Sequence, residues 1–307
     1  MMRMISVGAD QVRELVPMPA AITAVREAFV GLAAGEFEMP MRTVLRGGEF
    51  LDMAVHHRPS GTAAFKTLSL NFTGRDPAIV GTVVWSDLGR TDQLVAEAGT
   101  LTAIRTGAVT GVATDLLAPA DASTCVVFGT GAQAPDQVRA VLAVRSIERV
   151  TLVGRDQARA ERLADVLAGE LGGVHLEATT DGESAVGSAD VICCATPAQE
   201  PLFPLEALPD RVHVNAIGSF RPTMRELPDG LLAAGLVVVD DREAVLEEAG
   251  EILHAVAARV LDPDRMVELG TGLTTGVRPT PRTTFKSVGV AVQDWAVARL
   301  LANAVLQ

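Results

Sequence analysis

From about residue 124 onward the chain alternates short apolar runs with helical patterns, and this alternation constrains the fold more than any other feature. Short, nearly continuous apolar runs are typical of strands that are covered on both faces. The runs are TCVVFG, ERVTLVG, DVICCAT, VHVNAIG and LVVVD. Because helical stretches such as DQVRAVLAVRS and QARAERLADVLAG separate them, we expect a parallel sheet with right-handed crossovers.

A glycine-rich turn follows the first apolar run and precedes a helical stretch. The turn consists of Gly129, Thr130, Gly131, Ala132, Gln133 and Ala134. It fits the pattern G-x-G-x-x-A, in which the first glycine makes a tight turn, the second admits a pyrophosphate and the alanine lets the helix pack closely. The N–H groups at the helix N-terminus stabilise phosphate charge. We therefore predict a dinucleotide-binding turn, the alternative being a purely structural one.

The end of the second apolar run indicates which dinucleotide is bound. An NAD site usually places Asp or Glu about 20 residues beyond the glycines, where it accepts from the ribose 2′-hydroxyl. Here the run ends at Gly154, and Arg155 follows. An arginine suits a 2′-phosphate, so NADP(H) is favoured and NAD(H) remains possible. Alternatively, Arg155 is solvated and Asp156 caps the next helix.

The region before residue 118 has a different pattern of predicted secondary structure. Between about residues 41 and 86 the chain contains β-like runs separated by Gly, Pro and Asn turns, namely MRTVL, FLDMAV, AAFKTLSL and IVGTVVWSD. Helical patterns are predicted over 10–34, with a break near Pro17, over 105–118, and over 283–305 as one long amphipathic helix.

Composition excludes several classes of protein. The 307 residues are 48% hydrophobic, enough for a sizeable core, and the net charge of −12 argues against a nucleic-acid-binding protein. No apolar run reaches the ~18 residues of a membrane span, and the start lacks a secretory pattern. Cys125, Cys193 and Cys194 all lie in apolar runs, which favours buried thiols in a reducing cytoplasm. No histidine spacing indicates a metal site, and the absence of tyrosine excludes a catalytic phenol.

Several stretches together resemble the ornithine cyclodeaminase/mu-crystallin family, in the same order and over nearly the whole chain. They are AAFKTLSLNF, LTAIRTGAVTG, FGTGAQA, VNAIGSFRPTMREL and FKSVGVAVQDWA. The resemblance implies an α/β protein in which a Rossmann NAD(P)-binding domain, residues 119–284, is inserted into an α+β domain. Residues 1–118 and 285–307 form that second domain, which binds substrate and mediates dimerisation. A homodimer is therefore expected.

The resemblance also implies a site for the carboxylate of a small imino or amino acid, formed by Arg42, Lys66 and Arg105. Two guanidinium groups and an ammonium would bind a carboxylate through charge-assisted hydrogen bonds. Lys66 lies between apolar neighbours, where an unpaired ammonium would be costly, and it could also bias protonation of an imine nitrogen. Arg105 is expected to open a helix, where a cation opposes the dipole. The alternative for Arg42 is an exposed charge on a strand.

In family terms, two stretches should flank the nicotinamide. They are the loop 215–219, with Asn215, Ile217 and Ser219, and the run Ser287, Val288 and Gly289. Thr110 could line the pocket or pack a helix. Several titratable groups are interpreted as paired, capping or solvated instead of catalytic, namely His56, His57, Asp229, Glu248 and Glu251.

Departures from the family pattern indicate the reaction. Ornithine cyclodeaminases carry an acid/base aspartate where this chain has Phe220, and a second acid near Leu51, so a lyase is disfavoured although Asp52 is adjacent. The loop instead resembles that of ketimine reductases. These transfer a hydride from NADPH to the C=N carbon of Δ1-pyrroline-2-carboxylate or Δ1-piperideine-2-carboxylate, giving L-proline or L-pipecolate. Alternatives are an NAD(P)-dependent, alanine-type amino-acid dehydrogenase and a low-turnover NADP- and ligand-binding protein like mu-crystallin.

Overall fold

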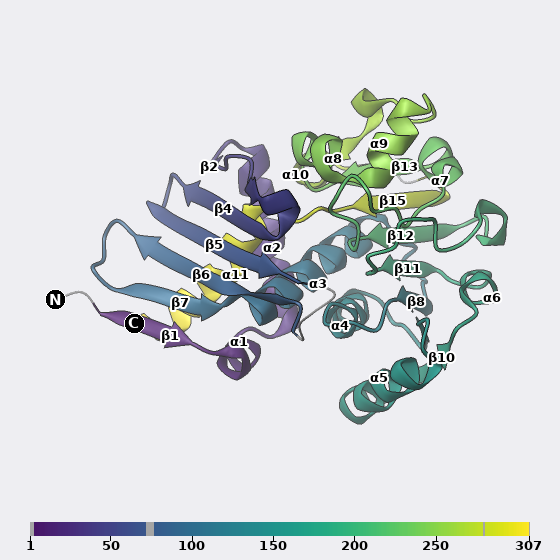
Figure 1. Cartoon of the computed structure of the whole chain (residues 1–307), viewed down its shortest axis with the longest axis horizontal. Coiled ribbons are helices and arrows are strands. Elements are labelled where there is room, and N and C mark those ends of the chain that lie inside the picture. Colours follow the sequence, from purple (N-terminus) through teal and green to yellow (C-terminus); the bar gives the residue numbers. More distant parts are fainter. Residues whose placement is uncertain (1–2, 72–76, 279, 307) are drawn as a thin grey trace. The chain divides into compact units, whose positions relative to one another are not determined.

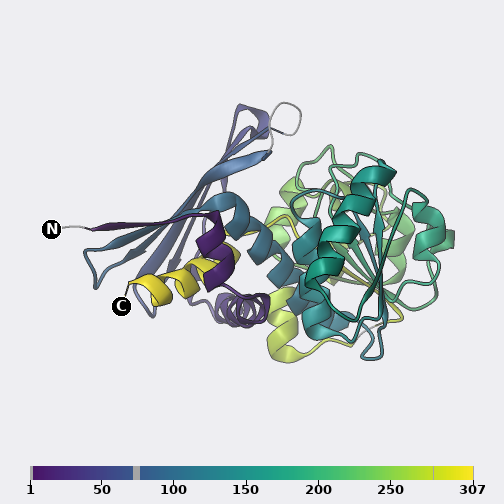
Figure 2. The same cartoon turned by 90° about the horizontal axis from the view of Figure 1, so that it is seen from below.

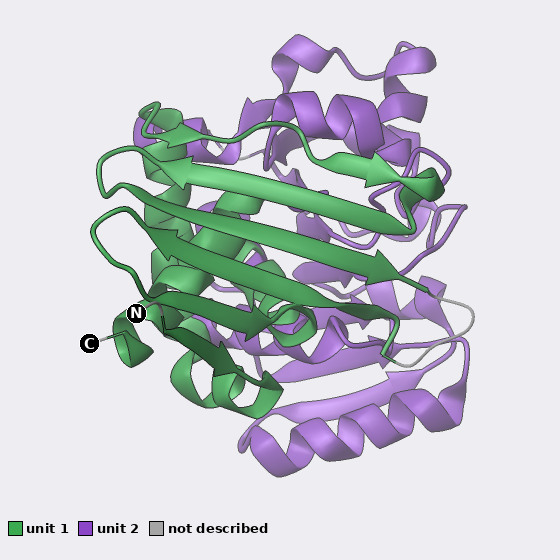
Figure 3. Ribbon diagram, turned by 60° about the vertical axis from the view of Figure 1, so that its left-hand side comes forward, with its two compact units in different colours: residues 1–109, 290–307 green, residues 110–289 purple. Residues whose placement is uncertain are grey.

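A computed structural model describes residues 3–71, 77–278 and 280–306, which form two compact units (Figure 3). Unit 1 comprises residues 1–109 and 290–307, and unit 2 comprises residues 110–289. The chain passes from one unit to the other within a helix at residue 109 and again after Gly289, whereas the domains predicted from the sequence change at 118 and 284. Phe72, in the first stretch of the family resemblance, lies outside the described residues, as do Met1 and Gln307.

Unit 1 is built on one mixed sheet (Figure 1). Its strands lie in the order β1-β7-β6-β5-β4-β2, with β3 also paired to β4. The pairing is antiparallel except between β1 and β7. Its elements are β1 (Met4–Val7), α1 (Ala9–Leu15), α2 (Met18–Ala33), β2 (Phe37–Glu38), β3 (Thr43–Leu45), the 3-10 turn η1 (Arg46–Gly48), β4 (Phe50–His57), β5 (Thr62–Leu70), β6 (Ile79–Asp87), β7 (Gln93–Glu97), the start of α3 (Ala98–Leu117) and α11 (Ala291–Val305).

The two faces of this sheet differ in burial. Along β5 the side chains of Ala64, Lys66 and Leu68 are buried, while those of Phe65 and Thr67 are exposed, as the pleat of a one-sided sheet requires. Helix α11 packs on β4, β5 and β6 and against α2, so the core of the unit lies on that side. Figure 3 shows the other face of the sheet without a covering element from the described part of unit 1.

Unit 2 contains an eight-stranded sheet in the order β10-β9-β8-β11-β12-β15-β13-β14. All its pairs are parallel, and Figure 2 shows helices on both faces, as predicted for a Rossmann-type domain. Its elements are the end of α3, β8 (Thr124–Phe128), α4 (Ala134–Val144), β9 (Arg149–Val153), α5 (Gln157–Glu170), β10 (His175–Thr179), α6 (Gly182–Val186), β11 (Val191–Cys194), η2 (Leu205–Ala207), β12 (Val212–Ala216), α7 (Asp229–Ala234), β13 (Leu236–Val239), α8 (Arg242–Glu248), α9 (Gly250–Ala257), η3 (Pro263–Arg265), β14 (Val267–Glu268), α10 (Leu269–Thr275) and β15 (Arg282–Lys286).

Two predictions about helices are wrong. The predicted helix over 283–305 is in fact a strand, β15, followed by the shorter helix α11. Gly289 has φ +82°, a left-handed conformation that interrupts any helix there, and Phe285 is fully buried in a strand between β12 and β13. Helix α3 begins at Ala98, so Arg105 lies in its middle and the argument from the helix dipole does not apply.

The buried thiols are as predicted, because all three cysteines are free and buried. Within the described part of the chain, no single helix is long and apolar enough to cross a membrane. Helices α1 and α2 pass that test only when taken together, across a bend of 81°.

Candidate active site

A buried group of opposite charges lies in unit 1, between β5, α3 and α11. The Lys66 ammonium is 2.8 Å and 2.7 Å from the two carboxylate oxygens of Asp294. The Nε atom of Arg105 is 3.3 Å from one of these oxygens, and its guanidinium also donates to the side-chain oxygen of Gln293. Asp294 therefore lies between the two cations and orients both.

The charge state of Lys66 follows from this environment. Burial lowers the pKa of Lys66 to about 7, Asp294 raises that pKa, and Arg105 and Arg42 lower it. Arg42, half-buried just before β3, is thus close enough to act on the ammonium. The structure therefore brings the three predicted cations together, and their binding of a carboxylate stays a prediction.

Sequence analysis did not single out Asp294, which is 1% exposed. The sequence does contain an indication of its role, because Asp294 is a carboxylate within the apolar stretch AVQDWAVARLL. A charged side chain that is buried in such a helix needs a partner of opposite charge. The neighbouring Gln293 is fully buried, and its amide nitrogen has no hydrogen-bond partner among the described residues. A polar donor beside Arg105 is therefore left for a ligand.

The glycine turn has the geometry of a dinucleotide-binding site. Gly129 has φ +107°, and a Cβ atom there would lie 2.6 Å from the carbonyl oxygen of Ala195, so only glycine fits. At Gly131 a Cβ would meet no atom within 4 Å, which leaves open space beside the backbone for a pyrophosphate. The side-chain oxygen of Gln133, just before α4, is buried without a partner among the described residues. The turn fits the cofactor predicted for it.

The end of β9 carries no carboxylate that could bind a ribose 2′-hydroxyl. A Cβ atom on Gly154 would lie 2.8 Å from the Thr130 methyl group. Arg155 is exposed, and Asp156 caps α5 by accepting from the Arg159 backbone N–H at 3.0 Å. Arg159, which sequence analysis missed, is also exposed, and its Nε donates to the Thr130 carbonyl oxygen at 3.3 Å. Arg155 and Arg159 are thus exposed residues that follow β9, the strand whose end binds the adenosine ribose in this fold.

Three of the residues expected to flank the nicotinamide, Asn215, Ser287 and Gly289, form hydrogen bonds with buried side chains of unit 2. The Asn215 amide donates to the Thr114 hydroxyl at 3.0 Å, so this side chain stabilises the interior of unit 2. The Asp240 carboxylate accepts from the Ser287 hydroxyl at 2.7 Å and from the Gly289 N–H at 2.8 Å. Ile217 follows β12 and is buried.

A second buried group of charges lies in unit 2 and was not predicted. We call Ser219, Glu226, Glu251 and Lys286 the buried charge cluster; all four residues are fully buried. The Lys286 ammonium is 3.0 Å from Glu251, so of the paired, capping and solvated roles considered for this residue the structure shows the paired one. Burial raises the pKa of Glu226 to about 7, against the opposing effect of Lys286.

The positions that carry acids in cyclodeaminases carry none here. Phe220 is half-buried and lies 5.5 Å from the Arg221 guanidinium carbon. Leu51 is buried, and the register places Asp52 opposite Thr67, on the face of the sheet away from Lys66. Other groups interpreted as paired are indeed paired: His56 with Glu38, His57 with Glu36, and Asp229 with Arg225 and His254.

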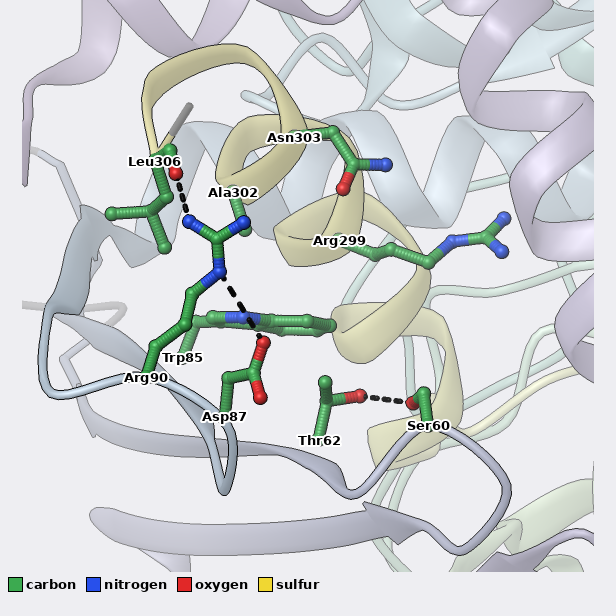
Figure 4. A pocket seen from close by; sticks show the side chains of 9 residues that line it. All are labelled: Ser60, Thr62, Trp85, Asp87, Arg90, Arg299, Ala302, Asn303 and Leu306. Carbon is green, nitrogen blue, oxygen red and sulfur yellow. Dashed lines mark hydrogen bonds and ion pairs between the residues drawn. The ribbon is translucent and has the colours of Figure 1, made fainter.

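A pocket of about 310 Å³ lies elsewhere in unit 1, beside Trp85 and the end of α11 (Figure 4). Its lining residues are Ser60, Thr62, Trp85, Asp87, Arg90, Arg299, Ala302, Asn303 and Leu306. The Arg90 guanidinium spans it, 3.6 Å from Asp87 and donating to the Leu306 carbonyl oxygen. None of the predicted site residues lines this pocket. No group of three His, Cys, Asp or Glu side chains placed to hold a metal ion occurs among the described residues.

Comparison with known proteins assigns the family. The model of the ornithine cyclodeaminase/mu-crystallin family matches residues 2–307. The chain belongs to this family. It is 36% identical to a Δ1-pyrroline-2-carboxylate reductase of Bacillus cereus, over 97% of this chain and 95% of that protein. The predicted resemblance is therefore confirmed.

Two solved structures have the same fold as this family member. The Thermococcus litoralis Δ1-pyrroline-2-carboxylate reductase, in complex with NADH and L-proline, superimposes with a TM-score of 0.92 at 28% identity, over 98% of this chain and 97% of that one. An archaeal alanine dehydrogenase dimer with bound NAD gives a TM-score of 0.90 at 27% identity, over 99% and 96% of the two chains. The predicted fold class, a Rossmann domain within an α+β domain, is confirmed.

Proposed function

We propose that this chain is an NAD(P)H-dependent oxidoreductase that reduces the C=N bond of cyclic ketimine carboxylates to the corresponding cyclic amino acids. The observation that carries the proposal is the buried group of Lys66, Asp294 and Arg105, with Arg42 nearby. It combines guanidinium groups that can bind a carboxylate with an ammonium that titrates near neutral pH. The curated relative and the proline complex described above support the same substrate class.

We assign a separate role in binding or proton transfer to each residue of this group. Arg42 and Arg105 bind the substrate carboxylate, because guanidinium groups form paired hydrogen bonds with it. Lys66, with a pKa of about 7, binds the same carboxylate and donates a proton to the imine nitrogen, which makes the adjacent carbon electrophilic. When bound, the reduced nicotinamide supplies the hydride for that carbon. Asp294 keeps Lys66 and Arg105 in place throughout.

The deciding experiment offers the purified protein Δ1-pyrroline-2-carboxylate, Δ1-piperideine-2-carboxylate, or pyruvate with ammonia, each with NADPH and with NADH. We expect turnover with the cyclic imines, giving L-proline or L-pipecolate, to exceed turnover with pyruvate and ammonia. The archaeal alanine dehydrogenase with this fold makes the open-chain reaction the second candidate. Faster turnover of pyruvate and ammonia would establish it instead.

We propose NADPH as the preferred cofactor. Support comes from the missing carboxylate at Gly154 and from the two exposed guanidinium groups of Arg155 and Arg159. Replacing Arg155 with alanine should weaken NADPH binding by about 10-fold or more, the scale of one charged hydrogen bond, and leave NADH binding nearly unchanged. Isothermal titration with both cofactors measures this, and an equal loss for both would show that Arg155 does not bind the 2′-phosphate.

Turnover also separates an enzyme from a low-turnover ligand-binding protein. The substitution Lys66→Met keeps the length of the side chain and removes its charge. We expect kcat/KM to fall by about 100-fold or more, as for loss of a general acid, with NADPH affinity unchanged. Initial rates and cofactor titration measure the two effects, and undiminished turnover would remove Lys66 from the mechanism.

We further propose a homodimer that functions in the cytoplasm. The face of the sheet in unit 1 that is uncovered in Figure 3 carries exposed apolar side chains. The strand register places Leu45, Phe50, Phe65 and Val80 on one face. Contiguous exposed apolar side chains are typical of protein interfaces. The related alanine dehydrogenase is a dimer, which makes a second copy of this chain the partner we expect. Free, buried cysteines suit a reducing compartment.

A further inference from the structure

The buried charge cluster lies behind two loops that follow neighbouring strands. Glu226 is the point at which these loops meet. One carboxylate oxygen accepts from the Thr196 backbone N–H at 2.7 Å and from the Thr196 hydroxyl at 2.8 Å. The other oxygen accepts from the N–H groups of Gly218 and Ser219, at 2.9 Å and 3.1 Å. Thr196 follows β11, and Gly218 and Ser219 follow β12, so one side chain ties both loops together.

Lys286 and Glu251 form further hydrogen bonds with Ser219, in the loop after β12. The Lys286 ammonium donates to the carbonyl oxygen of Ser219 at 2.5 Å and to its hydroxyl at 2.8 Å, and the Ser219 hydroxyl donates to Glu251. The loops approach so closely that a Cβ atom on Gly218 would lie 2.2 Å from the Thr196 nitrogen. The backbone N–H, the carbonyl oxygen and the hydroxyl of Ser219 are thus all bonded to charged side chains.

The strand order of the sheet in unit 2 indicates which half of a bound dinucleotide lies near these loops. The strand order changes direction between β8 and β11, and dinucleotides bind at the carboxyl ends of the strands at such a point. The adenosine half lies on the side of β9, where its ribose is bound, so the nicotinamide half lies on the side of β11 and β12. Thr196, Gly218 and Ser219 are therefore on the nicotinamide side of the site.

We propose that Glu226 is a positioning residue that holds the loops after β11 and β12 in the arrangement required to bind the nicotinamide half of the cofactor. A carboxylate suits four donors because it offers acceptors on both oxygens. A glutamine has one acceptor oxygen and an amide that donates. One orientation therefore leaves the N–H groups of Gly218 and Ser219 without their acceptor, and the other leaves the Thr196 N–H without it, because the Thr196 hydroxyl can rotate and accept from the amide. This inference rests on the proposed function and names a residue outside the substrate group.

The test compares whole cofactor with a fragment. Wild-type protein and the Glu226→Gln variant are titrated with NADPH and with 2′-phospho-ADP-ribose, which lacks the nicotinamide ring. We expect the variant to bind NADPH about 10-fold or more weakly, as for a buried charged hydrogen bond lost, and the fragment within about 2-fold of wild type. We also expect the fluorescence of NADPH to increase on binding to wild-type protein and to increase less on binding to the variant. The control Glu206→Gln removes an exposed carboxylate between β11 and β12 and should change neither affinity.

Other results of these titrations would refute either the positioning role of Glu226 or the proposed function. Equal weakening of cofactor and fragment, or no weakening of either, refutes the positioning role of Glu226. Failure of wild-type protein to bind either probe refutes the proposed function itself, and the inference with it. If the glutamine variant does not fold, Thr196→Val removes one donor from the same carboxylate, and a selective loss of NADPH affinity of up to about 10-fold is then expected. An unselective effect of Thr196→Val would again refute the proposal.

Discussion

Asp294 is the residue whose charge keeps Lys66 cationic near neutral pH. Burial, Arg105 and Arg42 all lower the pKa of Lys66, and Asp294 opposes them. Lys66 is cationic below its pKa of about 7 and neutral above it, so we expect kcat/KM to fall as the pH rises through about 7. The substitution Asp294→Asn removes the opposing charge, and the pKa of Lys66 should fall. The falling limb of the pH profile should therefore move to lower pH by at least about one unit.

Rates measured from about pH 5 to about pH 10 with one substrate test this prediction, because titration of the substrate itself cancels between the two proteins. Asp10→Asn, an exposed change on α1, is the control and should leave the profile in place. A limb that stays put or moves to higher pH would contradict the role given to Asp294.

The same residue illustrates what a sequence can and cannot show at this scale. Lys66 and Arg105 were predicted from the family resemblance, and for Lys66 the apolar neighbours along the chain supported that prediction. Asp294 was missed because its partner Lys66 lies 228 positions away along the chain, and Gln293 because its partner Arg105 lies 188 positions away. Arg159 was missed because only the three-dimensional turn brings it to the carbonyl oxygen of Thr130.

At the scale of elements, β15 depends on a single charged side chain at its end. Lys286 is one of two lysines in the sequence, and it is fully buried against Glu251 and Ser219. Replacing it with methionine leaves Glu251 buried without its cation, so we expect the free energy of unfolding to fall by about 3–5 kcal/mol. Urea denaturation measures this loss. The double variant Lys286→Met, Glu251→Gln should recover part of it, and a double variant less stable than the single one would contradict the pairing.

The strands and helices themselves were predictable where a local pattern decided them. The glycine turn with β8, β9, β11, β12 and β13 follows from apolar runs and from Gly129, whose φ value only glycine adopts readily. Residues 283–286 of β15 were assigned to a helix because they directly precede the amphipathic pattern that forms α11, and the prediction merged the two. The hydrogen bonds of β15 to β12 and β13 decide the matter, and such long-range pairing is invisible in a local window.

For the whole molecule, the uncovered sheet face of unit 1 is the surface through which we propose that two copies associate. Phe65 is 48% exposed at the centre of that face, with Val84 and Ala54 beside it on the neighbouring strands. If two copies pack through this face, an aspartate at residue 65 places a desolvated charge in each half of the interface. We therefore expect Phe65→Asp to convert the dimer to a monomer, with the mass from light scattering falling to half. Val166→Asp, the same kind of change at an exposed position of α5, should leave the mass unchanged. A variant at Phe65 that stays dimeric would show that the copies associate elsewhere, whereas a monomeric wild type would refute the homodimer.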